Sequence, residues 1–147
     1  MKLFQIEEPD GSPPDPTAAG VAIGIDASGR ETVVAVAIGG NAAMLEDRPG
    51  FERGLPVPGA EHGERWQELL EGARLRAERA LGRPATHAVL VVAPGARAAS
   101  AGLLDAAAQA AALVLLRVVE PDALPPHETP ALAAAVLAED LAPRPGG

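Results

Sequence analysis

The sequence contains no cysteine, and aromatic residues make up only 2% of its 147 residues. Without a thiol, the chain can form no disulfide bond, no thiolate nucleophile and no thiolate metal site. With so few aromatic rings, alanine, valine and leucine must fill the core. These side chains allow close contacts between helices and a sheet, but each buries less apolar area, so we expect modest stability.

Lysine is nearly absent as well, since Lys2 is the only lysine among twelve basic residues. The formal net charge is −8, and the arginines are scattered singly or alternate with glutamate, as between residues 74 and 83. That region is typical of a solvated helix face with i,i+4 ion pairs. Nucleic-acid binding usually requires a basic face, and an anionic membrane repels an acidic protein, so we expect neither partner.

The sequence also lacks a long hydrophobic run. Arg117 and Glu120 interrupt the longest candidate, which stays short of the roughly 18 apolar residues that a membrane-spanning helix needs. Residues 1–8 contain one lysine and then turn acidic, unlike a secretory signal. A cytoplasmic location is therefore the default expectation.

The length favours a single domain. Residues 7–19 contain four prolines and few apolar side chains, a composition that cannot bury enough surface to become ordered. We therefore expect a flexible, acidic, proline-rich leader at residues 1–19, one domain at residues 20–141, and a disordered tail at residues 142–147.

Within the domain, the hydrophobic pattern predicts five strands and three helices in the order β-β-β-α-β-α-β-α. Two valine-rich runs separated by turn residues predict a hairpin, and the last two strands are continuous apolar runs of the kind that is buried between helices. Gly82 and Thr129 are expected to cap helices, with Pro130 in the first helical position. The predicted strands are 20–27, 31–38, 42–45, 86–93 and 113–119, and the predicted helices are 64–81, 97–112 and 130–141.

This order predicts an α/β fold of the ribonuclease H-like type, with a mixed five-stranded sheet flanked by helices. Actin-like ATPases, sugar kinases, heat-shock chaperones and several nucleases are built on this unit. The order of the elements therefore indicates the fold but does not choose among these chemistries.

Two stretches resemble the nucleotide-binding domain of the seventy-kilodalton heat-shock chaperones (the DnaK-like family). Residues 81–94 (LGRPATHAVLVVAP) are similar to the family pattern LGxxVTxAVxxVPA, and residues 115–121 (LLRVVEP) are similar to LRxxNEP. Upstream, residues 24–26 (GID) stand where the family has its first phosphate-binding strand, GIDLGTT. The resemblance extends over about residues 20–141 and implies the first subdomain of the actin-like ATPase domain.

The resemblance implies a site for ATP or ADP with Mg²⁺. Asp26 matches the family's first aspartate and would contact the metal, with Gly24, Ser28 and Gly29 forming the phosphate-binding strand and turn. Glu120 matches the acid that positions the metal and the attacking water, so it is the candidate catalytic residue and a second metal contact. The residues alone leave another interpretation open for each acid: Asp26 caps the turn, and Glu120 is a solvated carboxylate at a strand end.

The chain departs from the family pattern in its phosphate-binding groups. Residues 27–30 (ASGR) replace LGTT, and no lysine follows Lys2, although the family uses a lysine beyond the third strand to stabilise the transferred phosphoryl group. Arg48 and Arg53 stand in the corresponding loop, and arginine does not replace a compact ammonium group. The second phosphate loop (DLGGGT), the adenosine-binding segment and the peptide-binding domain have no counterpart.

We therefore expect a truncated or degenerate chaperone-like nucleotide-binding module, with weak ATP and Mg²⁺ binding at most and no efficient hydrolysis. It would act through a protein partner or through self-association, which would cover apolar surface that the missing lobe covers in the family. One alternative is a small Mg²⁺-dependent nuclease of the Holliday-junction-resolvase type, with Asp26, Glu120 and Asp140 around the metal. Another alternative is a purely structural interaction module.

Overall fold

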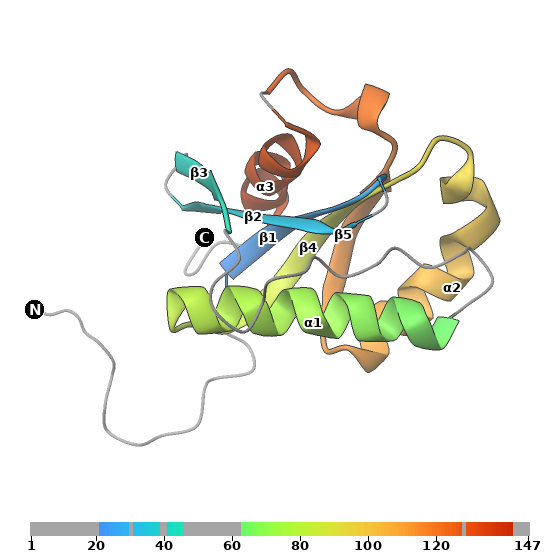
Figure 1. Cartoon of the computed structure of the whole chain (residues 1–147), viewed down its shortest axis with the longest axis horizontal. Helices are drawn as coiled ribbons and strands as arrows, with labels where there is room; N and C mark the ends of the chain where they lie inside the picture. The colour runs from blue at the N-terminus through green and yellow to red at the C-terminus, as the bar shows by residue number, and fades with distance from the viewer. Residues whose placement is uncertain (1–20, 30, 39–40, 46–62, 128, 143–147) are drawn as a thin grey trace, which may run out of the picture.

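The computed structural model describes residues 21–29, 31–38, 41–45, 63–127 and 129–142 (Figure 1). The elements are β1 (Val21–Ala27), β2 (Val33–Ile38), β3 (Asn41–Met44), α1 (Gly63–Leu81), β4 (Ala85–Val92), α2 (Ala96–Ala110), β5 (Val114–Val119), the short 3-10 helix η1 (Pro121–Ala123) and α3 (Pro130–Leu141). The predicted order of strands and α-helices is confirmed. The expected leader, Lys2, Arg48, Arg53 and residues 143–147 of the expected tail lie outside the described residues.

The five strands form one mixed sheet in the order β3-β2-β1-β4-β5. β2 is antiparallel to both β1 and β3, which confirms the predicted hairpin, whereas β4 is parallel to both β1 and β5. Figure 1 shows α1 and α2 on one face of the sheet and α3 on the other. The predicted α/β architecture, a five-stranded mixed sheet flanked by helices, is confirmed.

The larger part of the core lies between the sheet and the helices α1 and α2. Side chains alternate along a strand, so Ile23, Ile25 and Leu90 all point to this face and are fully buried. The apolar positions of α1 recur every three or four residues and meet these strands. Trp66 is only 3% exposed, which confirms that it is part of the core.

On the opposite face, α3 lies unusually close to the backbone of β1. A Cβ atom on Gly24 would lie 2.7 Å from the carbonyl oxygen of Ala131 and would overlap the amide nitrogen of Ala135. Alanines supply the facing residues of α3, so the helix can reach this distance only where the strand has no side chain. Gly24 is therefore required by helix packing.

The predicted helix caps at Gly82 and Thr129 are confirmed, whereas α2 ends at Ala110, two residues before the predicted end. Gly82 has a φ of 67°, the left-handed conformation that favours glycine after a helix. The hydroxyl of Thr129 accepts a hydrogen bond from the Leu132 amide at 3.2 Å, and Pro130 takes the first helical position.

The expectation that the last strand is buried is wrong. Of the six residues of β5, only Val119 is buried, and the Val114 side chain is 55% exposed. β5 is the outer strand of the sheet, where α2 packs beside it, whereas α3 packs on β1, β2 and β4. A parallel strand without helices over both faces remains half exposed, whatever its composition.

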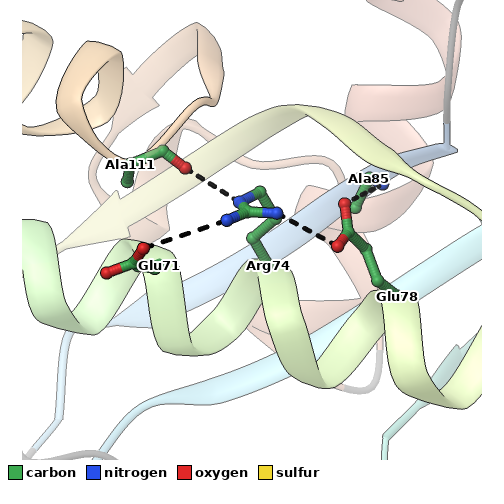
Figure 2. A network of polar contacts seen from close by, with 5 residues as sticks. All are labelled: Glu71, Arg74, Glu78, Ala85 and Ala111. Atoms are coloured by element: carbon green, nitrogen blue, oxygen red, sulfur yellow. Dashed lines mark hydrogen bonds and ion pairs between the residues drawn. The ribbon is translucent and has the colours of Figure 1, made fainter. Parts of the chain in front are cut away.

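Within the arginine-rich part of α1, Arg74 is less solvated than predicted, whereas Arg79 is exposed. Figure 2 shows the polar contacts of Arg74. The Arg74 side chain is only 17% exposed, and its Nε donates a hydrogen bond of 2.8 Å to the carbonyl oxygen of Ala111 at the end of α2. Its Nη1 donates to Glu78 Oε1 at 3.0 Å, and Glu78 Oε2 accepts from the Ala85 amide at 3.0 Å. The predicted i,i+4 ion pair is present between Arg74 and Glu78. Its two side chains also contact the end of α2 and the beginning of β4, so the pair joins three elements.

Candidate functional site

The topology brings the two candidate acids to one edge of the sheet. β1, β4 and β5 are mutually parallel, so their carboxyl ends lie at the same edge. Asp26 is the penultimate residue of β1, and Glu120 directly follows β5. Ligands of open α/β sheets usually bind at this edge, which makes it the candidate site.

Asp26 closes the turn that leaves β1. Its Oδ1 accepts a hydrogen bond from the Ser28 amide at 3.0 Å and another from the Ser28 hydroxyl at 2.5 Å. This is an Asx-turn, in which an aspartate side chain replaces a backbone turn contact. Gly29, the next residue, is exposed and has open space where a side chain would be. The observed contacts of the Asp26 carboxylate are therefore those of a residue that caps the turn.

Glu120 contacts the beginning of α2. Its Oε2 accepts a hydrogen bond of 2.9 Å from the amide of Gly95, the residue that precedes the helix. Gly95 has a φ of 86°, a conformation that glycine adopts without strain. The carboxylate thus lies at the positive end of the α2 dipole, where a negative charge is stabilising.

The two acids share an edge of the sheet but not a face. Ala22 and Gly24 face α3, and the alternation along β1 places Asp26 on the same side. Val119 also faces α3, so Glu120 faces the α2 side, in agreement with its bond to Gly95. β4 separates the two strands, which puts the backbones of the two acids about 10 Å apart.

A single Mg²⁺ ion bound directly by both acids would need oxygens at about 2.1 Å from one point. Because the two side chains face opposite sides of the sheet, one of them would have to turn around the end of the sheet to reach that point. Within the described ranges, no three His, Asp or Glu side chains are grouped so that they could hold a metal ion.

The remaining predicted residues divide between the turn and the interior. Ser28 and Gly29 lie in the turn after β1, whereas Gly24 lies two residues before Asp26 and is covered by α3. The Ser28 amide already donates to Asp26, and the Gly95 amide already donates to Glu120. Two amide donors at this edge are therefore already used within the chain and would have to be released before they could bind a phosphate.

Sequence reasoning missed Thr32 at this edge. Thr32 directly precedes β2, beside the end of β1, and is only 5% exposed. Among the residues that the structure describes, its buried hydroxyl oxygen has no hydrogen-bond partner. No signal in the sequence distinguishes it, because threonine is common at the start of strands.

Comparison with known proteins found no family model and no curated protein that matches this chain. In the part of the chain that the structure describes, no helix is both long and apolar enough to cross a membrane.

Proposed function

We propose that this chain is a ribonuclease H-like module related to the first subdomain of the heat-shock-chaperone ATPase domain. It binds ATP or ADP with Mg²⁺ weakly at most, does not hydrolyse ATP efficiently, and works through contacts with a protein partner or a second copy. The supporting observation is the sheet order β3-β2-β1-β4-β5 with Asp26 and Glu120 at the carboxyl ends of β1 and β5. These acids lie in the segments that resemble the chaperone family.

The contacts of the two acids support weak binding without catalysis. Catalysis of phosphoryl transfer depends on positioned cations and donors that stabilise charge on the phosphoryl oxygens. Here both acids accept hydrogen bonds from amides of their own chain, and the sequence contains one lysine, Lys2. A bound magnesium ion would neutralise phosphate charge, and Asp26 is the residue that would contact it through water.

The exposure of β5 supports the protein-contact part of the proposal. Leu115, Leu116 and Val118 are only partly buried, and Val114 is the most exposed of the large apolar side chains described. The other exposed large apolar side chains, Ile38, Met44 and Leu75, lie on other elements. The exposed apolar side chains are therefore spread over several elements, and β5 carries the most exposed of them.

The nuclease alternative is not favoured, because α3 carries Asp140 away from the candidate site. Ala131, Ala134 and Ala135 lie over Gly24, and Ala138 packs in the cluster that contains Ala22, further from Asp26. Asp140 follows in the last turn, about 13 Å along the helix axis from Ala131. This placement of Asp140 argues against a three-acid centre with Asp26 and Glu120.

Isothermal titration with ATP and Mg²⁺ tests the nucleotide part of the proposal. We expect a dissociation constant of roughly 100 μM or weaker, and no steady release of phosphate. Asp26→Asn should abolish any residual Mg²⁺-dependent heat, whereas Asp105→Asn, an exposed acid on α2, should change nothing. Micromolar binding together with steady turnover would contradict the proposal, and complete absence of binding would favour the purely structural module.

A further inference from the structure

We infer that Glu120 has a structural role. Its side chain joins the beginning of α2 to the end of β5 and does not serve to bind a metal or a water. The resemblance assigns this position to catalysis. The contact that Glu120 makes with the Gly95 amide accounts for its presence without a ligand.

The first step of the argument is the geometry of the junction. α2 begins after the left-handed Gly95, and no side chain of the preceding residue can cap it, because that residue is glycine. The first turn of α2 also contains no acidic residue. Glu120, which is 25 residues away in sequence, supplies both the acceptor and the negative charge.

The second step is the direction of the Glu120 side chain. It follows Val119, which faces α3, so its own side chain turns to the α2 side and away from the side of Asp26. A catalytic partner of Asp26 would be expected to share its side of the sheet. The register of β5 therefore favours the helix contact over a shared ligand.

The two roles predict opposite effects on stability. Acids that serve a ligand are commonly unsatisfied in the free protein, and their replacement often leaves stability unchanged or raises it. A capping acid stabilises the fold, and its loss lowers the thermal midpoint by about 2–5 °C for a chain of this size. We expect the larger drop for Glu120→Ala and a smaller drop for Glu120→Gln, which keeps an acceptor oxygen but loses the charge.

The experiment measures thermal midpoints of the full chain by circular dichroism, together with amide exchange by NMR. Asp122→Asn is the matched control, because Asp122 is an exposed acid two residues further on, and it should leave both readouts unchanged. In Glu120→Ala, exchange at the Gly95 amide should increase more than exchange at Val91 in the core.

Unchanged or raised midpoints in both Glu120 variants would overturn the inference, as would equal effects at Gly95 and Val91. The inference is independent of nucleotide affinity, so its failure would be distinguishable from tight ATP binding in the titration.

Discussion

At the scale of single residues, Gly24 shows how one missing side chain decides where a helix lies. The residue lies in the middle of β1, and backbone atoms of α3 occupy the space that its side chain would fill. The resemblance places this glycine in a phosphate-binding strand, whereas the structure gives it a packing role that needs no ligand.

Gly24→Ala should therefore destabilise the protein strongly. The neighbouring atoms belong to the backbone of α3, so the whole helix must shift, and we expect a loss of about 2–4 kcal/mol in the free energy of unfolding. Urea denaturation measures this loss. Gly102→Ala is the matched control, because Gly102 lies in α2 with open space around it, and there alanine should be neutral or stabilise by up to about 1 kcal/mol. A loss below 1 kcal/mol for Gly24→Ala would show that α3 moves away easily.

His87 makes stability depend on pH. Burial lowers the pKa of its imidazole below the ordinary value of 6.5, so the folded protein binds this proton less tightly than the unfolded chain. The contribution of His87 to stability is complete above pH 6.5 and is lost as the pH falls through the lowered pKa. Urea midpoints at constant ionic strength should fall less steeply below pH 6.5 in His87→Gln than in the unmodified chain.

The exposed His127 provides the control for that pH profile, and His127→Gln should reproduce the slope of the unmodified chain. His87 Nδ1 also forms a 2.7 Å hydrogen bond with the Thr86 hydroxyl, and the substitution removes this bond. The slopes of urea midpoint against pH are therefore compared instead of the midpoints themselves. Parallel slopes in the His87 variant and the unmodified chain would contradict the assignment.

At the scale of elements, Arg74 and Glu78 join α1 to the end of α2 and to the beginning of β4 (Figure 2). The last carbonyl groups of a helix lack partners within the helix, and Arg74 supplies one for Ala111. The next residue, Ala112, has a φ of 62°, which an alanine adopts only under strain. The contact thus holds a strained connection between α2 and β5.

Arg74→Ala should lower the free energy of unfolding by about 1–3 kcal/mol, because it removes charge-assisted hydrogen bonds and leaves Glu78 without its cation. Arg74→Lys should recover only part of this loss, since an ammonium group cannot reproduce the fork of a guanidinium. Chemical denaturation gives both values. Arg83→Ala, at an exposed position after α1, is the control and should change stability by less than about 0.5 kcal/mol. Equal effects at positions 74 and 83 would mean that the contact seen in Figure 2 contributes nothing.

At the scale of the whole molecule, the arrangement separates a structural edge of the sheet from the candidate functional edge. The Arg74 network lies where α2 ends and β4 begins, whereas Asp26 and Glu120 lie where β1 and β5 end. Each edge is held by side chains that bind backbone groups of another element or turn. The candidate functional edge is thus held by the same kind of contacts as the structural one.

The order of elements, the hairpin, the core position of Trp66 and the helix ends at Gly82 and Thr129 could all be predicted from the sequence. Each depends on local periodicity or on the conformation of one residue, which neighbouring residues in the chain largely determine. The positions of the acids at the ends of β1 and β5 could also be predicted, because the ends of two apolar runs in the sequence are enough to locate them.

The tertiary structure alone decided which surfaces meet. Gly24 lies against α3, and Arg74 reaches α2. β5 is a half-exposed outer strand of the sheet, and Asp26 and Glu120 face opposite sides of the sheet. These outcomes depend on the order of strands and on which helix covers each face, and both involve residues far apart in the chain. Periodicity indicates that a face is buried, but it does not identify the partner, because any apolar surface of suitable shape satisfies the same hydrophobic requirement.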